Sequence, residues 1–210
     1  MVEYKIRMSI FSKLFKQPKT AEEIADAVIY NIGKDAFVHV RDKEFKRLLA
    51  SYPLSKEQKE LVGVDLEISG VVYAYLLLEN LEEHVEHSTT KESFCSIRNA
   101  LIDAFVRYIK KGKTGGPLKR DMLVQVISMR CRDCRKEFER HKHELKPEDL
   151  KRNYWTEFCA NDCLNHFIGN FPNQETDVAF YDNLARWNMR LGNIIQQTIL
   201  DNAKTSYLKI

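Results

Sequence analysis

The sequence contains few residues that interrupt helices and few patterns that build sheets. Proline occurs five times and glycine eight times in 210 residues, whereas folds made of many short strands need frequent turn residues. The only short strand candidate is Phe37-Val38-His39-Val40. These shortages favour an all-α fold, which we expect to be an irregular bundle of about seven to eight helices.

The chain also lacks signals for export, membrane insertion and specific nucleic-acid binding. Residues Met1–Lys16 carry charges throughout and contain no continuous apolar core, unlike a secretory signal. The most apolar run, Ile68–Leu78, is too short to span a bilayer. The net charge of +3 arises from 33 basic and 30 acidic side chains, which is not the basic excess of a nucleic-acid-binding protein. We therefore expect a cytoplasmic protein without a transmembrane segment, whose thiols are mostly reduced.

No catalytic motif is complete. Gly112-Lys113-Thr114 matches the end of a phosphate-binding loop, but Arg107 occupies the position of the motif's first glycine. His84 and His87 share a helix face but lack the Glu-x-x-His pairs that a di-iron site requires. Serine-centred elbows, glycine-rich dinucleotide turns and His-Glu-x-x-His motifs do not occur. The sequence leaves enzymatic activity open and favours a protein that is not an enzyme.

Helix starts and apolar periodicity organise the chain around one long helix. Thr20 with Glu23, and Ser55 with Gln58, have the spacing of capping boxes. After the second box the pattern becomes apolar on all sides, which predicts a central helix around residues 56–87 with neighbours on several faces.

We expect a single helical domain over residues 1–210, because this length suits one core. Residues 1–17 are interpreted as an N-terminal arm. Its segment 4–16 has the pattern of a basic amphipathic helix that packs on the domain or makes weak contact with a membrane surface. Residues 110–117 are predicted to form a flexible basic loop and residues 203–210 a frayed tail. Translation from Met8 instead of Met1 would shorten the arm.

Four of the five cysteines form two closely spaced pairs. Cys131 and Cys134 are three residues apart, and Cys159 and Cys163 are four apart, so each pair shares a helix face. If the two helices fold back on each other at Pro147, both pairs lie roughly 18–24 Å from the turn. The four sulfurs are then predicted to face one another.

Facing thiols allow several kinds of chemistry. Four thiolates can bind zinc, and they also suit Cu(I) or an iron–sulfur cluster. Alternatively, the cysteines form disulfides or a redox-active pair, whose thiolates would be favoured by the adjacent Arg130, Arg132 and Arg135. His141 and His166 are candidate auxiliary ligands or bases. The remaining interpretation is that the thiols are ordinary core residues.

Three functions are consistent with these patterns. The first is a cytoplasmic helical binding or adaptor protein, acting on a protein partner or as a homodimer. The second is a metal-binding or thiol-redox protein, with zinc as the candidate cofactor of the four cysteines. The third is a small-molecule pocket between helices, lined by Tyr73, Tyr75, Trp155 and Trp187.

Overall fold

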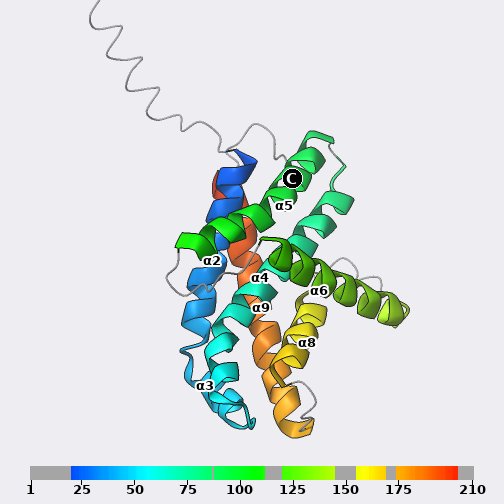
Figure 1. Ribbon diagram of the computed structural model, residues 1–210. Coiled ribbons are helices and arrows are strands. Elements are labelled where there is room, and N and C mark those ends of the chain that lie inside the picture. Colours follow the sequence, from blue (N-terminus) through cyan, green and yellow to red (C-terminus); the bar gives the residue numbers. More distant parts are fainter. Residues whose placement is uncertain (1–19, 87, 112–119, 145–154, 169–173, 203–210) are drawn as a thin grey trace, which may run out of the picture.

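The chain folds into helices that pack around α4. The computed structural model describes residues 20–86, 88–111, 120–144, 155–168 and 174–202. Helices make up 91% of these residues and no strand occurs among them, which confirms the all-α fold class. The described helices are α2 (Ala21–His39), α3 (Lys43–Ala50), α4 (Lys56–His84), α5 (Ser88–Lys111), α6 (Arg120–His141), α8 (Trp155–Ile168) and α9 (Gln174–Asn202) (Figure 1).

The predicted central helix is α4. It packs against α2, α5, α6, α8 and α9, and its residues 68–74 are all buried. By length and composition α4 is apolar enough to cross a membrane, but 67% of its most apolar window is buried inside the bundle. Its apolar character is therefore explained by neighbours on several faces.

Both predicted capping boxes are confirmed. The Thr20 hydroxyl accepts a hydrogen bond from the backbone N–H of Glu23, whose carboxylate accepts one from the Thr20 backbone. Ser55 and Gln58 repeat this exchange at the start of α4. The side chains thus satisfy N–H groups that have no partner within the helix.

The strand candidate at residues 37–40 is wrong. Residues 37–39 form the last turn of α2, and Val40 is its C-cap. Phe37 and Val38 are 57% and 55% exposed, whereas Ala36 and His39 are buried. The apolar residues at this point belong to two opposite faces of one helix, and a short run of sequence does not separate that pattern from a strand.

The expectations for three other segments concern residues that are largely outside the described ranges. Residues 1–17 and 203–210 lie wholly outside them. Of the predicted loop at 110–117, Lys110 and Lys111 instead belong to α5, and the rest is not described. The predicted hairpin turn around Pro147 is also outside the described residues.

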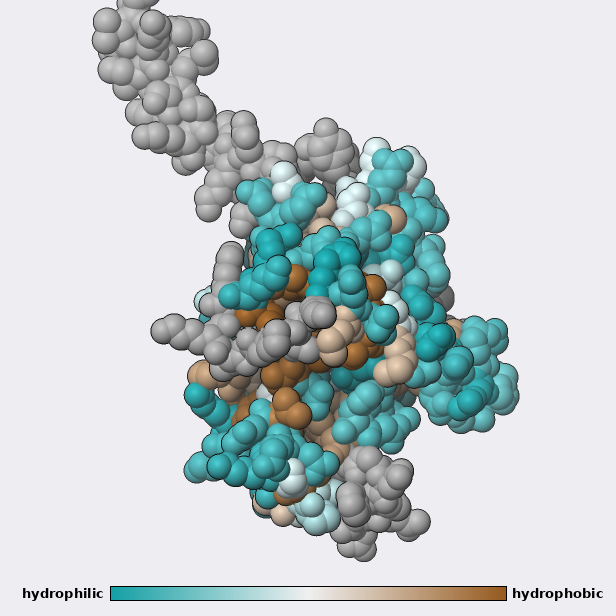
Figure 2. All heavy atoms as spheres, in the orientation of Figure 1, coloured by the Kyte–Doolittle hydropathy of each residue, from teal (hydrophilic) through white to brown (hydrophobic). Residues whose placement is uncertain are grey.

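The helices on opposite sides of α4 form two groups. In Figure 1, α2 and α3 lie on one side, and α6 and α8 lie on the other. The C-terminal part of α6 extends beyond the bundle (Figure 1), and hydrophilic residues cover this projecting part (Figure 2). The four paired cysteines, His141 and His166 are all on α6 and α8, so this side of the molecule holds the candidate metal or thiol site.

Candidate functional site

The four paired cysteines are all buried between α6, α8 and their neighbours. Cys131 and Cys134 are each 2% exposed, Cys159 is 1% exposed and Cys163 has no exposed surface. The sulfurs of Cys134 and Cys159 are 4.0 Å apart, consistent with the equal heights expected for an antiparallel pair. All four are free thiols, and so is the half-buried Cys95 on α5.

Burial controls the ionisation of these thiols. It raises the pKa of Cys131 to about 12 and that of Cys163 to about 12, although Arg135 and Arg130, respectively, act in the opposite direction. Burial also raises the pKa of Cys159 well above its usual range. The positive charges that were expected to favour thiolates are therefore outweighed by desolvation, and these three thiols stay protonated at neutral pH.

A metal centre requires several donors around one point. Among residues 20–202 as far as they are described, no group of three or more His, Cys, Asp or Glu side chains is placed to hold a metal ion. The zinc site formed by the four cysteines therefore stays a prediction.

The two candidate histidines lie in different surroundings. His141, at the end of α6, contacts Glu137 and Glu144 at 3.2 Å each. His166 on α8 lies 3.9 Å from a carboxylate oxygen of Asp162, and burial together with Arg130 lowers its pKa. The ion-pair contacts of both histidines are to carboxylates, so their role as auxiliary ligands or bases for the cysteines stays a prediction.

Next to Cys163 lies a buried ion pair that the sequence patterns did not reveal. Arg130 on α6 is 1% exposed. Its Nε donates to Asp162 Oδ2 at 2.7 Å, and its Nη2 donates to Ser69 Oγ at 2.6 Å. Asp65 adds a second carboxylate nearby, whose pKa is raised by burial and lowered in part by Arg130. These contacts join α4, α6 and α8 through polar groups within the core.

This network has the properties of a structural element. A buried charge is tolerated when it is paired and its hydrogen-bonding groups are satisfied, and Arg130 meets both conditions. A usable signal was present, because Arg130 lies three residues after Ile127 on the buried face of α6.

The four aromatic residues of the predicted small-molecule pocket make separate contacts. Tyr73 is fully buried and its hydroxyl lies 3.3 Å from that of Thr156. Trp187 donates to Asp35 at 2.7 Å. Trp155 packs on Phe138 and Phe158, and Tyr75 lies beneath the guanidinium of Arg98. Packing within the bundle accounts for these rings, and a pocket formed by them stays a prediction.

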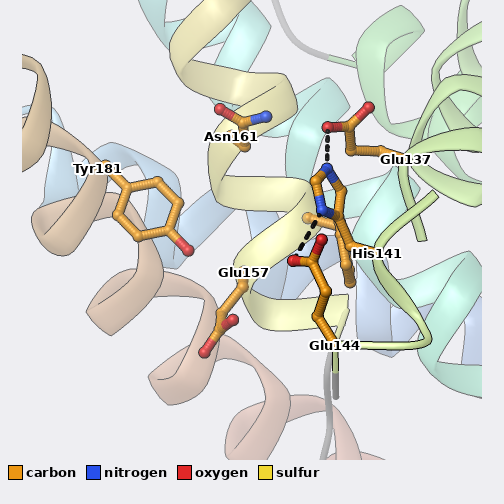
Figure 3. A pocket seen from close by; sticks show the side chains of 7 residues that line it. Glu137, His141, Glu144, Glu157, Asn161 and Tyr181 are labelled. Atoms are coloured by element: carbon orange, nitrogen blue, oxygen red, sulfur yellow. Dashed lines mark hydrogen bonds and ion pairs between the residues drawn. The ribbon is translucent and has the colours of Figure 1, made fainter.

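An open pocket of about 280 Å³ lies on the same side of the molecule, beside the cysteines. It is lined by residues of α6 and the turn after it, of α8 and of α9, namely Glu137, His141, Glu144, Glu157, Phe158, Asn161 and Tyr181. Figure 3 shows His141 between Glu137 and Glu144, with Glu157 and Tyr181 across the pocket. The carbonyl of Phe158 is also 4.0 Å from the sulfur of Cys134. Phe158 therefore borders both the pocket and the buried cysteines.

The pocket is acidic. Three glutamates and one histidine line it, and the hydrogen bonds from His141 to Glu144 and Glu137 raise the pKa of the imidazole. Burial, reinforced by Glu157, raises the pKa of Tyr181 to about 12, so the phenol is neutral at physiological pH. Glu137 also pairs with Arg140 at 2.9 Å. Counting the three carboxylates as ionised, the pocket and Arg140 together have a net charge of −1 when His141 is protonated and −2 when it is neutral. Such a site favours a cationic group.

The sequence singles out His141 only as an auxiliary of the cysteines, and it indicates neither this pocket nor the other residues that line it. The signal available was weak, because Glu137 and His141 have only the i, i+4 spacing that is common on helix surfaces. Glu157 and Tyr181 come from two other helices, and no local pattern links them to His141.

The chain was compared with protein-family models, with curated proteins and with solved structures. No family model matches, and no significant match was found among the curated proteins or the solved structures.

Proposed function

We propose that this chain is a helical binding or adaptor protein that takes a basic side chain of a protein partner into the acidic pocket. The observation that carries the proposal is the gathering of Glu137, Glu144 and Glu157 around a cavity of about 280 Å³. A cavity of this size is at the lower end of the range for small-molecule sites. It suits one long side chain better than a large cofactor.

The walls of the pocket favour a guanidinium group. Glu137 and Glu157 come from different helices, so a planar cation between them can meet carboxylates on two sides. Phe158 and Tyr181 add aromatic surface, on which the flat face of an arginine can stack. A lysine side chain has the same charge but lacks the paired N–H donors and the flat face of a guanidinium, and we therefore expect it to bind more weakly.

The side chains are accessible to a partner. Glu137, His141 and Glu144 are 32%, 45% and 62% exposed, and they lie at the projecting end of α6. A partner can reach them without unfolding the bundle. Exposed charge pairs contribute little to stability, so this cluster is better supported as a binding surface than as a stabilising one.

Fluorescence polarisation tests the proposal with a labelled peptide that carries three spaced arginines, against the same peptide with citrulline at each position. Citrulline keeps the shape and removes the charge. We expect binding of the arginine peptide only, weakened at least roughly ten-fold by Glu137→Gln combined with Glu157→Gln, because two charge-assisted contacts are lost.

The matched control is Glu60→Gln combined with Glu92→Gln, which makes the same change in net charge at two exposed positions on α4 and α5. If the pocket variant and the control weakened binding of the arginine peptide equally, the peptide would be recognising only the overall charge of the protein. Equal binding of the citrulline peptide would also contradict the proposal.

A thiol-redox function is a second candidate, favoured by the 4.0 Å distance between the Cys134 and Cys159 sulfurs. Oxidation by hydrogen peroxide would join these two sulfurs, with both thiol hydrogens leaving in two molecules of water. Intact-mass measurement under non-reducing conditions tests this candidate. The loss of two hydrogens in the parent protein, absent from Cys134→Ser, would support it, and an unchanged mass under mild oxidation would exclude it.

The metal-binding alternative has its own test. Metal content by inductively coupled plasma mass spectrometry, on tag-free protein purified under reducing conditions, reports zinc, copper or iron directly. Near-stoichiometric metal that disappears when Cys131 and Cys159 are both replaced would establish a site. Metal-free protein that is fully folded would exclude it.

A further inference from the structure

The outward face of α2 carries an exposed stripe of aromatic, aliphatic and basic side chains. Tyr30, Phe37 and Val38 are 62%, 57% and 55% exposed, and Lys34 and Arg41 between and after them are also exposed. These positions are spaced by four, three, one and three residues, so they share one side of the helix and its C-terminal turn. We call them the α2 stripe.

The α2 stripe lies opposite the face that anchors α2 in the bundle. The buried residues of α2 include Ile24, Val28, Ile32 and Ala36, which follow one another at steps of four on the other side of the helix. α2 is thus apolar on two faces, and the described part of the chain packs against only one of them. Large exposed apolar groups that cluster on one face are typical of interaction surfaces.

Five basic side chains lie on the stripe or in the residues that follow it. Lys34, Arg41, Lys43, Lys46 and Arg47 are all exposed, and none of them is among the ion pairs of the described residues. The guanidinium of Arg41 lies over the ring of Phe37, 3.2 Å from its centre. A cation and an aromatic ring are therefore presented together.

The acidic residues in the same stretch are already engaged within the fold. Asp35 accepts hydrogen bonds from Trp187 and Arg190. Asp42 caps α3 by accepting from two backbone N–H groups, and Glu44 pairs with Arg186. The basic side chains are left without local counter-charges, so the complementary partner is anionic.

We propose that the α2 stripe docks on an anionic membrane surface. A flat surface parallel to the helix axis can contact all five residues at once, since Tyr30 and Arg41 are separated by only roughly 16 Å along the axis. Aromatic rings are favoured at the boundary between lipid headgroups and acyl chains, and lysine and arginine meet the phosphates. α2 lies on the other side of α4 from α6 and α8 (Figure 1), and the stripe is opposite the buried face of α2, so the acidic pocket stays free for its own partner.

Sedimentation of the full-length chain with sucrose-loaded vesicles tests this proposal. Vesicles of phosphatidylcholine alone are compared with vesicles that also contain phosphatidylserine. We expect binding only to the anionic vesicles, and weaker binding as the salt concentration is raised. Each basic group near such a surface contributes roughly a five-fold increase in partitioning.

Two variants locate the contact. Lys34→Glu with Arg41→Glu is expected to weaken binding by a factor of roughly 25 or more, because two favourable charges are removed and two unfavourable ones are added. Phe37→Ala is expected to weaken it by roughly ten-fold through lost apolar burial. All three substituted residues are exposed, and circular dichroism checks that the variants are folded.

The controls are on α6 and in the turn after it, on the other side of the bundle. Lys136→Glu with Lys142→Glu makes the same change in charge at exposed positions, and Met122→Ala removes an apolar side chain that is 50% exposed. Binding by these controls equal to that of the parent protein supports the proposal.

Four results would overturn it: no binding to anionic vesicles, equal binding to neutral vesicles, equal weakening by stripe and α6 variants, or parent-like binding by the stripe variants. The last would place the lipid contact elsewhere, for example in residues 4–16. Stripe-dependent binding to a single-stranded oligonucleotide or to polyglutamate, without vesicle binding, would identify a different anionic partner and also reject the membrane.

Discussion

Successive turns of α6 serve two different environments. Cys131 and Cys134 face the interior, where they are almost completely buried, and Glu137 and His141 line an open pocket on the following turns. The cysteines are the most distinctive residues of the sequence, but burial keeps most of these thiols protonated. The glutamates are common surface residues, yet it is they that line the open pocket. Distinctive residue types therefore do not identify the accessible site in this protein.

The pKa of a histidine also differs between the interior of the bundle and the pocket. His39 is buried against Phe45 and Trp187, and burial lowers its pKa to about 4. At the pocket, the hydrogen bonds to Glu144 and Glu137 raise the pKa of His141. Desolvation dominates in the first case and charge-assisted hydrogen bonding in the second. The contrast between interior and pocket can be tested at the level of single residues.

The largest effect is expected from breaking the buried ion pair. Arg130→Met leaves Asp162 and Ser69 buried without their donor, and we expect the free energy of unfolding to fall by about 3–5 kcal/mol. Urea unfolding followed by circular dichroism measures the loss. Removing the second charge as well, by Asp162→Leu in the same chain, should restore much of the stability, because no unpaired charge is then left in the core.

The matched control for this substitution is Arg120→Met, on the same helix. Arg120 pairs with Asp103 at the surface, where the two side chains are 56% and 48% exposed, so its loss should leave the free energy of unfolding nearly unchanged. If the two substitutions lowered the free energy of unfolding by similar amounts, the buried face of α6 would not be closed to solvent, contrary to the account given above.

The next largest effect is expected in the pH dependence of the free energy of unfolding, through His39. Its pKa is about 4 in the folded chain, against an ordinary value of 6.5, so the unfolded chain binds the proton first as the pH falls. The free energy of unfolding should therefore drop by up to about 3 kcal/mol between pH 6.5 and pH 4. His39→Phe keeps an aromatic ring and should abolish this part of the pH dependence.

Urea unfolding of both proteins across that pH range checks the prediction. Carboxyl groups with raised pKa values, such as Asp65, contribute with the opposite sign, but they are common to both chains and cancel in the difference. Identical pH profiles for the parent and the variant would contradict the assignment to His39.

A smaller contrast is expected between two glycines of α4. A β-carbon at Gly70 would lie 2.5 Å from a methyl group of Ile32, whereas one at Gly63 would have no neighbour within 4 Å. Gly70→Ala should destabilise the protein by about 1–3 kcal/mol through overpacking. Gly63→Ala should stabilise it by up to about 1 kcal/mol, because alanine is the better helix former. Thermal unfolding that shifts in the same direction for both would argue against close packing at Gly70.

The smallest effect is expected in the pocket itself. Raising the pH through the pKa of His141 removes one positive charge, so the arginine peptide should bind roughly two- to five-fold more tightly at the higher pH. His141→Gln should bind the peptide with little pH dependence in the same range. Fluorescence polarisation of the two proteins, at pH values on both sides of the imidazole pKa measured by NMR, provides the test.

Much of the fold could be predicted from the sequence because its signals are local. The capping boxes at Thr20 and Ser55 mark helix starts, and the all-round apolar pattern after Ser55 identifies the central helix. The strand prediction at the end of α2 was wrong because Phe37 and Val38 are apolar yet exposed. Periodicity gives the faces of a helix, but it does not say which of two apolar faces is covered.

The candidate site was harder to predict because its residues meet only in three dimensions. The cysteine spacing correctly suggested that Cys134 and Cys159 are neighbours. The pocket combines Glu137 and His141 with Glu157 and Tyr181, which are more than 15 residues away along the chain. Neither their convergence nor the degree of burial that sets the pKa of a thiol can be obtained from spacing alone.

The most direct test of the acidic pocket as the binding site is an NMR titration of the isotope-labelled chain with N-acetyl-arginine amide, with the citrulline analogue as control. We expect shifts with the arginine compound only, concentrated on the backbone amides of Glu137, His141, Glu157, Asn161 and Tyr181. Shifts that are absent from these residues, or that are equally large with citrulline, would contradict the assignment of the pocket as the site that recognises a basic partner.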